Sequence, residues 1–87
     1  MQKYLVKYIR DEKRNPIATV VCEKGGKVGW SLCSKKDRFL KQEGVYLALS
    51  RSKPFSEYTK DELPFSMADT LEEILSYMHD RSLRFFK

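Results

Sequence analysis

Residues 17–33 read IATVVCEKGGKVGWSLC, and this stretch decides the fold. β-Branched and aromatic residues dominate on both sides of Gly25-Gly26, a composition typical of strands. The two glycines supply the positive φ angles that a tight hairpin turn requires. We therefore expect strands at 17–23 and 27–33. A two-residue loop at the glycines places Val21 opposite Trp30 and Val20 opposite Ser31.

The expected hairpin has two different faces, because side chains alternate along a strand. One face is apolar and needs cover from the second helix, a tail or another subunit; it carries Ile17, Thr19, Val21, Val28, Trp30 and Leu32. The other face is built of smaller side chains, which let a helix approach closely; it carries Ala18, Val20, Cys22, Gly29, Ser31 and Cys33.

A third strand is expected upstream of the hairpin, where residues 3–10 read KYLVKYIR. The β-branched and aromatic residues favour a strand. Alternation places Tyr4, Val6 and Tyr8 on one face and Leu5, Lys7 and Ile9 on the other. Residues 11–16 are a polar turn in which Pro16 excludes a helix.

A first helix is expected directly after the hairpin. Ser34, with Asp37 three residues later, fits an N-cap, and the pattern predicts a helix over 35–52. Its expected stripe is Leu40, Gly44, Leu47, Ala48 and Arg51. Glycine inside a helix costs roughly 1 kcal/mol relative to alanine, so Gly44 is expected to serve close contact with the small-residue face.

A second helix follows a loop over 53–64. Thr70 and Glu73 have the spacing of a capping box, which predicts a helix over 71–84. Its buried stripe is Leu71, Ile74, Leu75, Met78 and Ser82. The element order is therefore βββαα, an α+β fold in which two helices pack on a three-stranded antiparallel sheet. The 87 residues leave room for one domain, residues 1–87.

The composition indicates a basic cytoplasmic protein. The longest apolar runs are too short to span a bilayer, and the N-terminus lacks the apolar stretch of a signal peptide. Residues 1–53 hold thirteen Lys and Arg against five Asp and Glu, whereas residues 54–87 hold four against seven. The basic part predicts an anionic partner; the alternative is a solvated surface whose two parts attract each other.

Little in the sequence points to catalysis, a cofactor or a metal. His79 stands alone and is expected at the surface or in a cap. In the expected register Cys22 and Cys33 lie about 13 Å apart along the sheet, beyond the roughly 7 Å that a disulfide allows. The carboxylate pairs 61/62 and 72/73 are sequence neighbours and point different ways. We therefore expect no enzyme.

The densest cluster of basic residues lies at the expected start of the first helix: Lys35, Lys36, Arg38 and Lys41. Cations there oppose the helix dipole, a local conflict that a bound phosphate would relieve. Further residues of this candidate nucleic-acid-binding surface are Arg10, Lys13, Arg14, Arg51 and Lys53, which Lys24 and Lys27 could extend. The alternative is a solvated helix face that Ser34 and Asp37 already cap.

Aromatic residues lie among these basic positions, namely Tyr4, Tyr8, Trp30, Phe39 and Tyr46. Aromatic rings beside cations can stack on the unpaired bases of single-stranded nucleic acid, although a small domain also needs aromatics in its core. No signature of an RNP, KH or double-stranded-RNA-binding module is present. Binding is therefore expected to depend on phosphate contacts, with little sequence preference.

Residues 28–39, VGWSLCSKKDRF, are followed by Lys41, Gly44, Ala48 and Arg51. This order of residues resembles small accessory proteins of large tailed bacteriophages, which carry a similar G-x-S-x-C, D-x-F, K, G, A and R pattern. The resemblance covers about half the chain and rests on packing and basic residues. It implies a protein that acts in the infected bacterial cytoplasm by binding host enzymes or nucleic acids. One such protein, of similar size and charge, inhibits a ribonuclease toxin–antitoxin system and acts with RNA.

The leading prediction is therefore a non-enzymatic phage accessory protein that binds RNA and antagonises a host factor such as a defence ribonuclease toxin. DNA remains an alternative ligand. A second alternative is a protein–protein inhibitor of a host enzyme, using the acidic segment 57–73 and the C-terminal helix with Phe85 and Phe86 as anchors. A third is a homodimer through the second apolar sheet face, which is compatible with either of the others.

Overall fold

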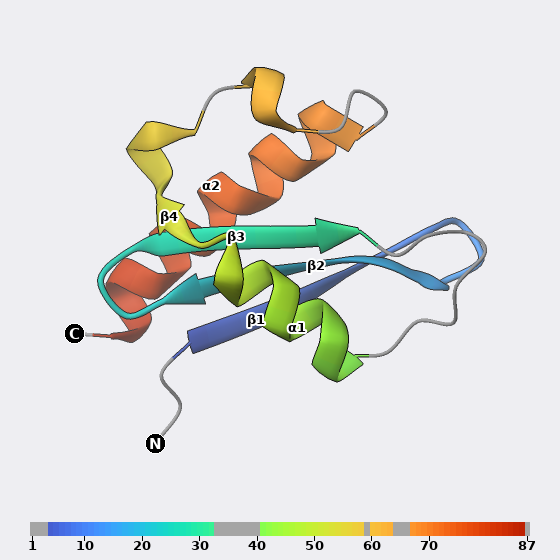
Figure 1. Ribbon diagram of the computed structural model, residues 1–87, viewed down its shortest axis with the longest axis horizontal. Helices are drawn as coiled ribbons and strands as arrows, with labels where there is room; N and C mark the ends of the chain where they lie inside the picture. Colours follow the sequence, from blue (N-terminus) through green and yellow to red (C-terminus); the bar gives the residue numbers. More distant parts are fainter. Residues whose placement is uncertain (1–3, 33–40, 59, 64–66, 87) are drawn as a thin grey trace.

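The computed structural model describes residues 4–32, 41–58, 60–63 and 67–86 (Figure 1). The elements follow in the order β1 (Tyr4–Arg10), β2 (Pro16–Glu23), β3 (Lys27–Leu32), α1 (Lys41–Ser50), β4 (Lys53–Pro54), the 3-10 helices η1 (Phe55–Glu57) and η2 (Lys60–Glu62), and α2 (Ala68–Phe85). The three expected strands are confirmed to within a residue or two among the described positions.

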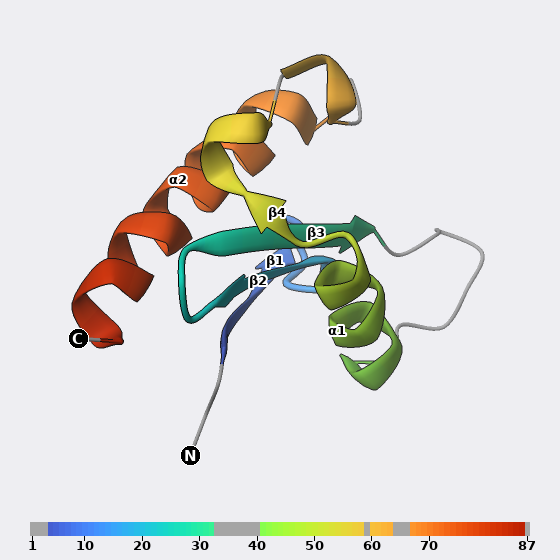
Figure 2. The same cartoon turned by 60° about the vertical axis from the view of Figure 1, so that its left-hand side comes forward.

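One antiparallel sheet in the order β1-β2-β3-β4 forms the middle layer of the molecule. The two α-helices lie on opposite faces of this sheet, α1 over β2 and β3 and α2 across the other face (Figure 2). The predicted α+β class with two helices packed on an antiparallel sheet is confirmed. The short β4 was missed, because the loop expected at 53–64 contributes two residues that pair with Lys27 and Val28.

The expected register of the hairpin is wrong by one residue. Val20 lies opposite Trp30, and Val21 lies opposite Gly29. The loop has three residues, and the amide of Gly26 donates to the carbonyl of Glu23 at 3.0 Å, with φ of +103° at Gly25 and +89° at Gly26. A two-residue loop would place Lys24 directly opposite Lys27, an unfavourable pair of like charges that this loop avoids.

The observed register also changes which side chains share a face. Leu5, Val20, Cys22 and Val28 form the main core with α2, whose buried residues are Ala68, Leu71, Leu75 and Met78. Trp30 packs against the edge of this core. Thus α2 covers Val28 and Trp30, which were predicted on the apolar face. Val20 and Cys22 lie on this same face, so their predicted place on the small-residue face is wrong.

The face toward α1 carries the small side chains of β3, as expected, together with Thr19 and Val21 of β2. The hydroxyl of Ser31 donates to the carbonyl of Gly44 at 2.8 Å. A Cβ atom at Gly44 would lie 2.6 Å from Oγ1 of Thr19. The predicted close contact of Gly44 with the sheet is therefore confirmed.

The helix predictions need two further corrections. Leu47 is 37% exposed and Arg51 follows α1, so neither residue belongs to a buried stripe of this helix. The expected helix start at residue 35, its cap Ser34 and the stripe residue Leu40 lie outside the described residues. The prediction that Thr70 begins a capping box is wrong, because α2 begins at Ala68 with Met67 as its N-cap. Burial of Ala68 against the core favours this earlier start. Among the described helices, none is long and apolar enough to cross a membrane.

Replacing Gly44 by alanine is expected to destabilise the protein by about 1 kcal/mol, although alanine is the better helix former. The new methyl group would press on Oγ1 of Thr19, a buried hydroxyl that has no hydrogen-bond partner among the described residues. In a Thr19→Ala background the same Gly44→Ala change is expected to be neutral or stabilising. Chemical denaturation of the four proteins of this double-mutant cycle measures the coupling, and additive effects would contradict the assigned contact.

Candidate nucleic-acid interface

The described part of the predicted basic surface divides between two ends of the sheet. Arg10, Lys13 and Arg14 lie at the β1–β2 turn, toward the end where α1 begins with Lys41 (Figure 1). Arg51 and Lys53 lie nearer the β2–β3 hairpin, at the other end. Lys35, Lys36 and Arg38 lie outside the described residues.

The β1–β2 turn holds its basic side chains at the surface. The carboxylate of Asp11 accepts from the backbone amides of Lys13 at 2.9 Å and Asn15 at 2.8 Å, which fixes the turn. Arg14 adopts φ of +65°, and its carbonyl accepts from the Arg10 guanidinium at 3.0 Å. The turn therefore presents three exposed cations, while one of its two carboxylates, that of Asp11, is engaged by the backbone.

Lys41 connects this end of the sheet with α1. Its Nζ lies 5.4 Å from the centroid of the Tyr8 ring. Tyr8 and Arg10 are two residues apart on β1 and so share the face toward α1. A cation over an aromatic ring is attracted by the ring's quadrupole, which holds positive charge beside an aromatic surface. Lys41 and Tyr8 thus place a cation beside an aromatic ring at the edge of the sheet, and Arg10 follows on β1 with its guanidinium bound to the Arg14 carbonyl.

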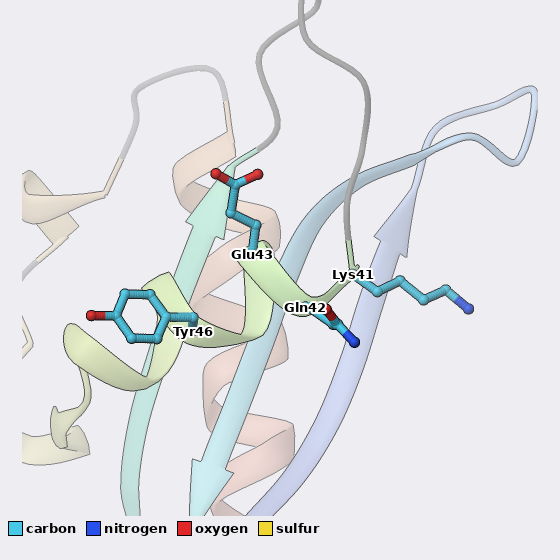
Figure 3. Close-up of a pocket in the computed structure, with 4 residues that line it drawn as sticks. All are labelled: Lys41, Gln42, Glu43 and Tyr46. Atoms are coloured by element: carbon cyan, nitrogen blue, oxygen red, sulfur yellow. The ribbon is translucent and has the colours of Figure 1, made fainter.

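A groove of about 350 Å³ lies between β1 and α1. Its lining residues are Tyr4, Tyr8, Lys41, Gln42, Val45, Tyr46 and Leu49. Figure 3 shows a second hollow that shares part of this lining, formed by Lys41, Gln42, Glu43 and Tyr46; the Lys41 side chain extends past β1, while Glu43 points away from Lys41. The ring of Tyr46 is 71% exposed and points away from Lys41. The groove is therefore aromatic, with a cation at the end where α1 begins.

Arg51 and Lys53 are engaged within the protein. The Arg51 guanidinium carbon lies 5.2 Å from the Trp30 ring centroid, and its NH1 donates to the Trp30 carbonyl at 3.4 Å. The ammonium group of Lys53 lies 4.6 Å from the ring centroid of Tyr58 and forms an ion pair with Glu62. The Arg51 contacts tie the connection after α1 to β3, and the Lys53 contacts tie it to Tyr58 and Glu62, so both cations have a structural role.

Tyr58 completes this second cluster. Its hydroxyl donates to the carbonyl of Val28 at 2.9 Å. Burial and the nearby carboxylate of Glu62 raise the pKa of Tyr58 to about 12. The hydroxyl therefore stays protonated through the physiological range and remains a hydrogen-bond donor.

His79 and Cys22 both pack within the protein. The His79 ring stacks on Phe55 with centroids 5.3 Å apart, and its Nε2 lies close to Gly26, so it joins α2 to η1 and the hairpin. Cys22 is buried, as expected, and burial raises the pKa of its thiol; Cys33 lies outside the described residues. Among the described residues, no group of three or more His, Cys, Asp or Glu side chains could hold a metal ion.

The residues of the groove were only partly identified from the sequence. Tyr4, Tyr8, Tyr46 and Lys41 were candidates, but Gln42, Val45 and Leu49 were not. Their signal was a second helical stripe with i, i+3 and i+7 spacing, beside the stripe that carries Gly44 and Ala48. Trp30, in contrast, lies on the opposite face of the sheet, and Phe39 lies outside the described residues.

Comparison with protein-family models, curated protein sequences and solved structures gave no significant match.

Proposed function

We propose that this protein binds RNA through its basic surface and acts by binding rather than by catalysis. The observation that carries the proposal is the placement of the Lys41 ammonium group over the Tyr8 ring, at the end of the sheet that also carries the basic β1–β2 turn. This arrangement offers positive charge for phosphates beside aromatic rings for bases, the two features that single-stranded nucleic-acid binders combine. Lys35, Lys36 and Arg38 precede Lys41 in the sequence and supply further cations to the proposal.

The phage resemblance gives this binding a biological setting. In the cytoplasm of an infected bacterium, an RNA-binding accessory protein would antagonise a host factor such as a defence ribonuclease toxin. It would do so by occupying the RNA or the RNA-bound host protein. This mechanism requires neither a catalytic group nor a cofactor.

Reversing two charges before α1 tests the phosphate contacts. The Lys36→Glu/Arg38→Glu variant is expected to bind a labelled single-stranded RNA about tenfold or more weakly, because two phosphate contacts are replaced by repulsion. Its log–log salt slope should also become shallower, by roughly 0.7 for each lost contact on a single strand. Fluorescence anisotropy over a salt series measures both quantities.

The matched control is Lys24→Glu/Lys27→Glu. It makes the same change in net charge with two exposed lysines of the hairpin, at the opposite end of the sheet from the β1–β2 turn (Figure 1). We expect this control to lose much less affinity. Equal losses in both variants would show that net charge alone governs binding, and unchanged affinity in the first variant would refute the assigned surface.

The alternative of a protein–protein inhibitor is favoured by exposed apolar side chains on α2. Tyr77, Leu83 and Phe85 are each about half exposed, whereas Phe86 packs against the core. Of the two expected anchors, Phe85 is therefore the accessible one. If this alternative holds, association with a host protein should survive nuclease and high salt and be weakened by Phe85→Ala. Loss of the association after nuclease treatment would exclude it.

A further inference from the structure

We propose that the groove between β1 and α1 binds unpaired bases of single-stranded RNA, with Tyr8 and Tyr4 as the stacking rings. This inference rests on the proposed function and names the form of RNA that the site accepts. Paired bases in a duplex are stacked within the helix, so their faces are not offered to such rings. The groove therefore predicts a preference for single strands that phosphate contacts alone would not produce.

The position of α1 creates the groove. The helix packs on β3 and β2, where a Cβ at Gly29 or Gly44 would collide with the facing element. Among the described elements, α1 therefore lies beside the outer part of this sheet face, along β1, rather than over it. Tyr4 and Tyr8 lie on that part of the face, opposite Glu23 and Thr19 of β2, and both are half-buried. Their rings are held by the sheet but remain accessible from the groove.

The spacing of the two tyrosines suits separate bases. They are four residues apart on one strand, so their Cα atoms lie about 13 Å apart at the usual rise per residue. Aromatic residues on a sheet surface commonly stack several bases of one strand in this way. Val45 and Leu49 of α1 supply an apolar wall beside them, and the Gln42 amide offers a donor and an acceptor for base edges.

The charge at the groove favours a polyanion over an apolar peptide. Lys41 lies over Tyr8, and Arg10 is the next residue on the same face of β1. The carboxylate of Glu43, the acidic residue in the first turn of α1, points away from Lys41 (Figure 3). A base stacked on Tyr8 would share the ring with the Lys41 ammonium group, which lies 5.4 Å from its centroid, and would bring its phosphate close to that charge.

The test replaces the rings while keeping apolar cover. Tyr8→Leu and Tyr4→Leu retain bulk on the sheet but remove the aromatic face, whereas Tyr8→Phe retains that face. The control is Tyr77→Leu, the same change at a half-exposed tyrosine of α2 on the other side of the sheet. Binding is measured with matched single-stranded RNA, duplex RNA and single-stranded DNA. A single-stranded RNA that contains 2-aminopurine reports stacking through fluorescence quenching.

We expect Tyr8→Leu to weaken single-stranded RNA binding at least about fivefold, since stacking of one base contributes roughly 1–3 kcal/mol. Tyr4→Leu should act in the same direction. Tyr77→Leu should bind like the wild type. Tyr8→Phe should bind more tightly than Tyr8→Leu because it keeps the aromatic face, and the quenching should disappear only in the Leu variants of β1. If single-stranded DNA binds as tightly as single-stranded RNA, recognition depends on bases and phosphates alone. If the DNA binds more weakly, the protein also contacts the 2′-hydroxyl. Both results are consistent with base stacking in the groove.

Base stacking in the groove would be refuted if the wild-type protein binds single-stranded RNA with a steep salt dependence and Tyr4→Leu and Tyr8→Leu bind it with the same affinity. Equal affinity of the wild type for duplex and single-stranded RNA would refute it too. Absence of RNA binding by the wild type at low salt would instead overturn the proposed function itself. The two failures are thus distinguishable.

Discussion

The Gly29→Ala variant is expected to lose about 3 kcal/mol or more of unfolding free energy, a large part of the stability of a domain this small. A Cβ atom at Gly29 would lie 1.9 Å from the carbonyl oxygen of Ala48 and 3.1 Å from the Cα atom of Ser52. Both are backbone atoms, so no side-chain rotation can relieve the overlap. The C-terminal part of α1 would have to move off the sheet.

Urea denaturation measures this effect, and Gly25→Ala is its control. Gly25 has a φ of +103°, but a Cβ atom there would have no described atom within 4 Å. The Gly25→Ala variant is therefore expected to lose only the energy of backbone strain, about 1–2 kcal/mol. Gly29→Ala should therefore be clearly the less stable of the two. If its stability stays within 1 kcal/mol of the wild type, α1 does not approach β3 as described.

The second large effect is expected for Leu71→Ala, which should cost about 2–5 kcal/mol. Leu71 is fully buried in the first turns of α2, where it belongs to the core formed with Leu5, Val20 and Val28. Removing three carbon atoms there leaves a cavity that β2 and β3, held in the sheet, can fill only partly.

Leu83→Ala provides the matched control, because it makes the same change on the same helix at a side chain that is 57% exposed. It is expected to change stability by no more than about 0.5 kcal/mol. Thermal unfolding of both variants makes the comparison direct. Similar losses for the two would mean that α2 is not docked through the face that carries Leu71.

Strand positions and the core stripe of α2 could be predicted because each depends on a local pattern. Alternation in β1 correctly placed Leu5 and Tyr8 on opposite faces, and the structure turns Leu5 toward the core. The stripe of Leu71, Leu75, Met78 and Ser82 is buried as predicted, while Ile74 lies at its margin. In each case the spacing of the apolar residues matches the side-chain period of a strand or a helix. Neighbouring residues therefore suffice for the prediction, without knowledge of distant contacts.

The hairpin register could not be read locally, because Gly25-Gly26 suits both a two-residue and a three-residue loop. The choice depends on packing: the observed register turns Val20, Cys22 and Val28 together toward α2. The start of α2 was misplaced for a related reason, since burial of Ala68 prevails over the capping signal of Thr70.

The basic surface could be proposed from the sequence only as a set of residues. The fold decides its grouping: Lys41 contacts Tyr8 at the end of the sheet that also carries the β1–β2 turn, whereas Arg51 and Lys53 contact Trp30, Tyr58 and Glu62 at the other end. That division arises from β4, a two-residue strand too short to carry a sequence pattern.

RNA binding by the basic surface is best tested by a salt titration of binding to a labelled single-stranded RNA, with duplex DNA as the control. We predict micromolar or tighter binding to the RNA that falls steeply with salt, with a log–log slope of about −0.7 for each neutralised phosphate. We also predict weaker binding to the duplex. Absence of RNA binding at low salt would refute the proposed function and leave the basic residues as a solvated surface.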